Sequence, residues 1–240
     1  MARLFLYKVY GDIISPMNTI NEFFASIYRW MAIGVAFTAV AAYVTYTSGL
    51  LAYLAVNPVV FYVLVGAHLL LYLGIQFIQN KISVPVAFVL FFVYAGMTGV
   101  LISSLLAFFV FTNLNLLIGI FAATIALFVG LAILGYRTKI DMSGWGIFLG
   151  ASTFGIVLLA ILNATLIQAS LFSLFIAAAV LVVFAGLTVY DSQYYKNVFP
   201  MLQTDEEKRR FSIIGALHMY VNFIAMFQSI LRIVGFFNQN

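Results

Sequence analysis

The sequence predicts an all-α membrane protein with seven transmembrane helices. Of its 240 residues, 65% are hydrophobic and 8% are charged, whereas soluble domains contain roughly 45–50% apolar residues. Seven apolar stretches are each long enough to cross the hydrocarbon core, for which a helix needs roughly 20 residues. The regular alternation of polar and apolar residues expected of transmembrane β-strands is absent. We therefore expect one membrane domain over residues 1–240, with no soluble domain.

The seven spans follow one another with short connections. They are predicted at residues 22–47, 59–79, 84–110, 114–135, 145–167, 171–193 and 210–236. The first follows "TINE", Thr19 to Glu22, and the last follows "TDEE", Thr204 to Glu207; both patterns are typical of a capping box. Asn57 and Pro58 supply an N-cap and a proline in the first turn of the second span. The other spans are identified by their apolar length.

The basic residues predict the orientation of the chain. All of the eleven Lys and Arg residues except Arg232 lie in or near the N-terminal segment or in alternate connections. They are Arg3, Lys8, Arg29, Lys81, Arg137, Lys139, Lys196, Lys208, Arg209 and Arg210. By the positive-inside rule, the N-terminus and the even-numbered connections are cytoplasmic. The net charge of +4 is explained by this asymmetry, so no nucleic-acid partner is expected.

Among the seven acidic residues, Asp191 alone belongs to a predicted membrane helix. An aspartate at the bilayer centre costs about 2.5–3.5 kcal/mol on insertion scales, so such a residue indicates a functional site with a partner. Asp191 is also only five residues before Lys196, near the cytoplasmic end of its helix. Two interpretations stay open: a functional carboxylate, or an interfacial aspartate paired with Lys196.

The last predicted helix carries its polar and small residues on one face. This stripe follows helical spacing and consists of Gly215, His218, Asn222, Ala225, Ser229 and Arg232. Polar groups facing lipid would lack hydrogen-bond partners, so the stripe should face other helices or a water-filled cavity. We therefore expect the last helix to be central. A re-entrant last segment, which would return the C-terminus to the cytoplasm, is the alternative.

Several classes of function are excluded by the residues that are missing. The chain has no cysteine, and its two histidines, His68 and His218, lack the convergent ligands of a zinc site. A retinal protein needs a lysine in its last helix, and residues 215–235 contain none. A catalytic pair of membrane acids, or a nucleophile with its base, is also missing. We expect no enzyme and no cofactor beyond weakly bound calcium.

Two segments resemble the last two helices of the Bax inhibitor-1 family, the transmembrane Bax-inhibitor-motif proteins. They are "AGLTVYDSQYYKN" and "GALHMYVNFIAMFQSILRIVG". The segments "FFASIYRWMAIGVAFTAVAAYV" and "YRTKIDMSGWG" are similar to the first helix of the family and to its connection between helices four and five. The most specific piece is "YDSQ", formed by Tyr190, Asp191, Ser192 and Gln193. The resemblance covers most of the chain.

The resemblance implies a seven-helix bundle around the last helix and a passive calcium leak gated by pH. In the family, two aspartates on the sixth and seventh helices share a proton and separate when it leaves. Asp191 matches the first of them, but Asn222 stands in the place of the second. Because an amide N–H can replace the shared proton in the contact, we expect weakened pH sensitivity here. His218, one turn from Asn222, is a candidate replacement sensor.

The remaining expectations concern ions, partners and location. Arg232 matches a family arginine on the last helix, but the second helix offers only His68, Gln76 and Gln79 and no acid to pair with it. Arg232 therefore either gates or extends to the membrane interface. A single membrane acid permits only weak calcium contact at Asp191. The alternative function is a non-conducting regulator that binds a membrane protease or another membrane protein. The expected location is the bacterial inner membrane.

Overall fold

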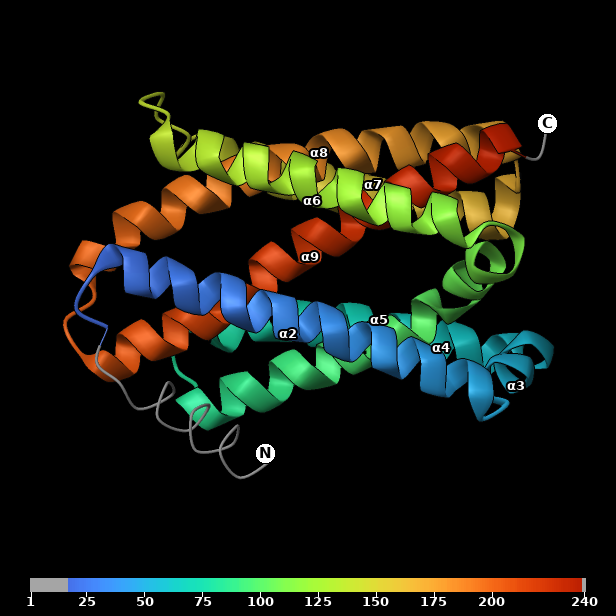
Figure 1. The fold of residues 1–240 in the computed structure, drawn as a ribbon, viewed down its shortest axis with the longest axis horizontal. Helices are drawn as coiled ribbons and strands as arrows, with labels where there is room; N and C mark the ends of the chain where they lie inside the picture. Colours follow the sequence, from blue (N-terminus) through green and yellow to red (C-terminus); the bar gives the residue numbers. More distant parts are fainter. Residues whose placement is uncertain (1–16, 239–240) are drawn as a thin grey trace.

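The computed structural model describes residues 17–238, which form helices and no strands (Figure 1). Within this range seven helices are long and apolar enough to cross a membrane, as predicted. They are α2 (Ile20–Thr47), α4 (Pro58–Ile78), α5 (Val84–Thr112), α6 (Leu114–Arg137), α7 (Trp145–Leu162), α8 (Ser170–Val198) and α9 (Asp205–Asn238). Arg3 and Lys8, which contribute to the predicted orientation, lie outside the described residues.

Both predicted capping boxes are formed. The Thr19 hydroxyl accepts a hydrogen bond from the backbone N–H of Glu22, whose carboxylate accepts one from the Thr19 N–H. Thr204 and Glu207 make the same reciprocal pair at the start of α9. The free backbone donors of these two helix starts are thereby satisfied within the first turn.

The structure corrects several details of the helix boundaries. The connection after α2 contains a short helix, α3 (Leu50–Val56), which is too short to stand out as a span. Asn57 does not cap α4, because its side-chain amide donates back to the carbonyl of Tyr53 in α3. A π-helical turn, Asn163–Ile167, follows α7, and a 3-10 turn, Phe199–Met201, follows α8. The last helix begins at Asp205 instead of 210, since its charged first turn is helical although it is not apolar.

The last helix is the centre of the bundle. In the most apolar 18-residue stretch of α9, 50% of the residues are buried, whereas 6% are buried in the corresponding stretches of α4 and α7. It packs against α8, α2, α5 and α6, and Figure 1 shows it running obliquely between α6, α7 and α8 on one side and α2, α4 and α5 on the other. At 34 residues it is one continuous helix, about 51 Å long at 1.5 Å per residue. A continuous helix of this length is long enough to cross the hydrocarbon core.

The bundle has two chemically different ends. The end that carries the α4–α5, α6–α7 and α8–α9 connections holds Lys81, Lys139 and Lys208, and is here called the basic end. The other, here called the opposite end, carries α3, the α5–α6 and α7–α8 connections and the C-terminal turns of α9. Among residues 17–238, Arg232 is the one Lys or Arg located toward the opposite end. The distribution of charge expected from the sequence is therefore present in the fold.

A glycine allows α6 and α8 to pack closely next to the "YDSQ" segment. A Cβ atom built on Gly135 would clash with the carbonyl oxygen of Val189 and lie 2.8 Å from Cβ of Ser192. The obstacle is backbone, which cannot rotate away as a flexible side chain can. Gly130, one and a half turns earlier on the same helix, has no such neighbour within 4 Å. The contact between α6 and α8 therefore requires glycine at 135 but not at 130.

We expect Gly135→Ala to destabilise the protein by about 1–3 kcal/mol, because the added methyl group must separate two helices. Gly130→Ala is the matched control: it makes no clash and should be neutral or stabilising by up to about 1 kcal/mol, since alanine favours the helix. Thermal unfolding in detergent measures both. Equal melting temperatures for the two variants would contradict the close packing.

The orientation can be tested by labelling, because the chain contains no cysteine. Ser48→Cys and Lys139→Cys place single exposed thiols at the opposite and basic ends respectively. If the basic end is cytoplasmic, a membrane-impermeant maleimide added to intact spheroplasts should label Cys at 48 and spare Cys at 139 until the membrane is permeabilised. The reverse pattern would overturn the predicted orientation.

Candidate functional site

The candidate site is centred on a hydrogen bond between α8 and α9. The side-chain amide of Asn222 donates to Oδ2 of Asp191 over 2.7 Å. Both residues are buried, with 3% and 7% of their surface exposed. Within residues 17–238, this is the single hydrogen bond that the Asp191 carboxylate accepts from the protein. The two residues singled out from the sequence are thus in direct contact.

Lys196 does not pair with Asp191. Its ammonium donates to the backbone carbonyl of Tyr136 over 2.8 Å and lies 5.1 Å from the centre of the Tyr136 ring. The interpretation of Asp191 as an interfacial aspartate neutralised by Lys196 is therefore wrong. Lys196 instead closes the C-terminal end of α6, where free carbonyl groups attract a cation.

The other residues of the "YDSQ" segment each contact a different neighbour. The Tyr190 hydroxyl lies against the backbone of Gly146 in α7, so close that a Cβ there would be 2.5 Å away. Ser192 donates to the carbonyl of Thr188 in its own helix and packs against Gly135 of α6. The amide of Gln193 accepts from the N–H of Met142 and donates to the carbonyl of Ile140, both over 2.7 Å. Three of these residues therefore fix α8 to α6, α7 and their connection.

The α6–α7 connection held by Gln193 also carries an acid at the membrane surface. The backbone N–H of Ser143 donates to Asp141 over 2.9 Å and holds the pKa of that carboxyl below its usual value. Asp141 lies outside the spans and is exposed. It therefore stays ionised at neutral pH and belongs to the surface of the basic end.

His218 joins three helices through a second polar chain. Its Nδ1 lies 2.8 Å from the hydroxyl of Tyr195 in α8, and its Nε2 lies 2.8 Å from the side-chain amide nitrogen of Gln76 in α4. Gln79 donates to the Gln76 oxygen over 3.4 Å. Both ring nitrogens of His218 are thus engaged with neutral partners. This chain lies one helical turn from Asn222, as its spacing predicts.

His68 belongs to a separate layer nearer the opposite end. Its Nε2 lies 2.9 Å from the hydroxyl of Thr98, and its ring stacks on Tyr94 at 4.2 Å between centroids. Tyr94 contacts Tyr220 of α9, whose hydroxyl lies 2.6 Å from that of Thr38 in α2. The two histidines therefore belong to different hydrogen-bonded groups. In the described part of the chain, no three His, Cys, Asp or Glu residues gather where they could hold a metal ion.

Arg232 lies at the boundary of two cavities toward the opposite end. The first has a volume of about 380 Å³ and includes His68, Thr98 and Ser229 in its wall. The second, of about 550 Å³, includes Ser104 and Ser170. Arg232 lines both and is exposed, and it makes no hydrogen bond or ion pair with residues 17–238. The structure places Arg232 apart from the contact between Asp191 and Asn222.

Sequence reasoning missed part of the polar core. Tyr195 is one turn after Asp191 on α8, and its contact with His218 was not expected. The second span contains no acid; its contribution is a stripe of polar side chains at helical spacing: His68, Tyr72, Gln76 and Gln79. That spacing was the available signal, because in a lipid-facing helix such residues would lack partners.

Comparisons with known proteins agree with this arrangement. A family model described as inhibitor of apoptosis-promoting Bax1 matches residues 20–239. Inner membrane protein YbhL of Escherichia coli is 34% identical over 227 residues, covering 93% of this chain and 95% of its own. An uncharacterized protein of Deinococcus radiodurans is 33% identical over 218 residues, covering 90% and 91% of the two chains. This protein therefore belongs to the Bax inhibitor-1 family of integral membrane proteins.

Proposed function

We propose that this protein is a passive leak pathway for calcium or other cations, closed by the contact between α8 and α9. The observation that carries the proposal is the buried hydrogen bond from Asn222 to Asp191. A carboxylate inside a membrane bundle is costly and by default indicates a functional site, of which ion pathways are one class. Here the carboxylate faces the central helix, which is the element that every other part of the bundle surrounds.

A partly polar cavity beside α9 supports the proposal. The cavity of about 380 Å³ is lined by Ala225, Ser229 and Arg232 of the α9 stripe. Tyr220 and Val221, which precede Asn222 in the chain, also line this cavity, whereas Asn222 and Asp191 do not. On the other side of Asn222, Tyr195 and Phe23 are fully buried and pack against each other. In this proposal the route continues from the cavity to the basic end between α8 and α9, where the hydrogen bond holds them together.

The proposed pathway binds cations weakly. A tight calcium site uses six to eight oxygen ligands, several of them carboxylates. The other acids among the described residues lie in the first turns of α2 and α9 or in the α6–α7 connection. Transient coordination by Asp191, the Asn222 carbonyl, backbone carbonyls and water fits this set of groups. Weak binding suits a leak, because an ion must leave a site as readily as it arrives.

We place the protein in the bacterial inner membrane, with the basic end in the cytoplasm. The similarity to an inner membrane protein over almost the whole chain supports this location, and the basic connections support the orientation. The alternative, a non-conducting regulator of a membrane protease or another membrane protein, predicts no flux in the absence of its partner. Purified protein in liposomes separates the two.

We expect Asn222→Ala to increase cation leak at every pH. The substitution removes the donor that holds Asp191, and a hydrogen bond to a charged group contributes about 1.5–3 kcal/mol. The open population should therefore rise roughly ten- to a hundredfold. Calcium-dye fluorescence in proteoliposomes measures the flux, and Asn197→Ala, an exposed change near the end of α8, serves as the control. If wild type and Asn222→Ala are both impermeable to calcium and to monovalent cations, the regulator is favoured.

We expect Asn222→Asp to convert a flat pH profile into a steep one. An asparagine can donate to a carboxylate or accept from a carboxylic acid, so the wild-type contact survives titration of Asp191. Two aspartates hold together at low pH by sharing a proton and repel each other when it leaves. Leak through the variant should therefore rise with pH, while leak through the wild type changes little.

The same assay tests His218 as a sensor. His218→Gln keeps side-chain polarity but removes the imidazole, so the pH profile of the wild type should be unchanged if His218 does not sense pH. If leak through the wild type already depends steeply on pH, the role assigned to Asn222 is refuted. If that pH dependence is lost in His218→Gln, the histidine is the pH sensor.

A further inference from the structure

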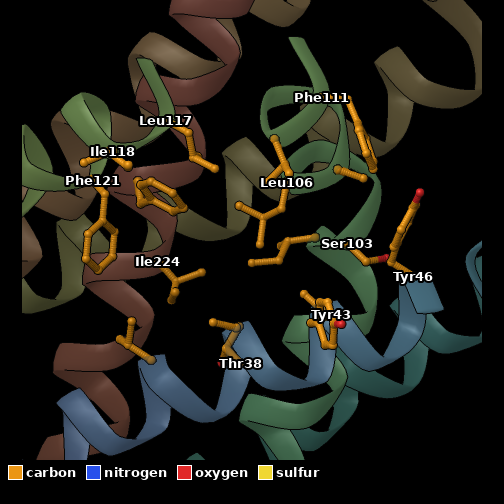
Figure 2. Close-up of a pocket in the computed structure, with 17 residues that line it drawn as sticks. Thr38, Tyr43, Tyr46, Ser103, Leu106, Phe111, Leu117, Ile118, Phe121 and Ile224 are labelled. Atoms are coloured by element: carbon orange, nitrogen blue, oxygen red, sulfur yellow. The ribbon is translucent and has the colours of Figure 1, made fainter. Parts of the chain in front are cut away.

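A deep apolar groove opens between α2 and α6 in the half of the bundle toward the opposite end. It has a volume of about 440 Å³ and reaches α9 at its floor. Figure 2 shows Thr38, Leu106, Phe121 and Ile224, from α2, α5, α6 and α9, pointing toward a common space. Nearer the basic end, ring contacts of Tyr28 with Phe128 and of Phe24 with Tyr136 close the same interface. The groove is therefore local to one half of the membrane.

Apart from the hydroxyl groups of Tyr43 and Tyr46, the wall of the groove offers no free polar group to water. Its hydroxyl groups other than those of tyrosine belong to Thr38 and Ser103, and both are already satisfied by the protein. Thr38 donates to backbone carbonyls and contacts the Tyr220 hydroxyl, and Ser103 donates to the carbonyl of Val100 over 2.7 Å. No charged residue lines the groove. An apolar cavity without free polar partners does not hold ordered water.

The dimensions and position of the groove match one lipid chain. Along α2 the lining extends from Val35 to Tyr46, about 16 Å at 1.5 Å per residue. This is roughly half of the hydrocarbon thickness of about 30 Å, and so the depth of one leaflet. Tyr46 is one residue from the end of α2, where an aromatic ring with a hydroxyl suits the headgroup region. The groove thus starts at the membrane surface and ends near the bilayer centre.

We propose that this groove binds one acyl chain of a bilayer lipid from the leaflet at the opposite end. The chain would contact Ile224 and Phe227, which are buried at the floor although they face an open groove. Ile224 and Asn222 are two positions apart, so they point about 200° from each other around α9. The bound chain therefore supports α9 from behind, on the face turned away from Asp191. The proposal stands on the groove alone and does not depend on ion conduction.

Fluorescence quenching by brominated lipids tests the occupant. The two tryptophans, Trp30 and Trp145, are first replaced by phenylalanine, since neither lines the groove. Single tryptophans are then placed at Phe227, in the groove floor, and at Phe128, which is equally buried but away from the groove. Ile125→Trp, on the exposed face of α6, reports on annular lipid. Because quenching depends on how deep the tryptophan lies in the bilayer, each variant is measured with a set of lipids brominated at different carbons.

We expect Phe227→Trp to be quenched as strongly as Ile125→Trp, and Phe128→Trp to keep most of its emission. Quenching of Phe227→Trp no stronger than that of Phe128→Trp would overturn the proposal, and would be the result if a second copy of the chain covered the groove. Quenching by aqueous iodide instead of brominated chains would show a wet groove and also overturn it. Ile224→Trp provides the same readout if Phe227→Trp does not fold.

A groove-filling substitution checks that the quencher reaches the tryptophan through the groove. Ala39 is exposed on α2 and lines the groove, whereas Ala36, one turn earlier and also exposed, does not. Ala39→Phe should reduce the quenching of Phe227→Trp, and the matched Ala36→Phe should leave it unchanged. Equal quenching in both backgrounds would contradict binding in the groove.

Discussion

The polar face of α9 is the constraint on which the rest of the bundle depends. Hydrocarbon cannot satisfy His218, Asn222 or Ser229, so a helix that carries them must be enclosed by other helices. The enclosing helices supply matched partners: Asp191 for Asn222, and Tyr195 with Gln76 for His218. Because those partners are themselves polar, α8 and α4 are in turn fixed in rotation. The position of the central helix thus determines which faces of its neighbours point inward.

Much of this arrangement follows from the sequence. The apolar runs and capping boxes predict the seven spans, and the spacing of polar residues on the last helix predicts its central place. That spacing alone does not predict that Asp191 contacts Asn222, because the sequence of one helix does not reveal how it is aligned with another. The family resemblance was needed to identify the two residues as a pair. Helix packing sets that register through close approaches such as the one at Gly135, which depend on tertiary geometry.

The features that sequence reasoning missed have the same origin. The partner of Lys196 is a backbone carbonyl, and backbone groups of a distant helix leave no mark in the order of side chains. The amide of Gln193 likewise binds two backbone groups of the α6–α7 connection. The side chain of Asn57 does not cap α4, because its amide donates instead to the carbonyl of Tyr53 in the adjacent short helix α3. Each case is a local preference overruled by a contact formed in the folded chain.

The four consecutive contacts of "YDSQ" have a mechanical consequence. Tyr190, Ser192 and Gln193 tie α8 to α7, α6 and their connection, whereas Asp191 alone reaches α9. The segment therefore connects α8 with α6 and α7, here together called the leaf, and one hydrogen bond from it reaches α9. One turn later on α8, Tyr195 adds a second contact with α9, at His218. Any displacement that parts Asp191 from Asn222 without breaking the other three contacts must carry the whole leaf with it.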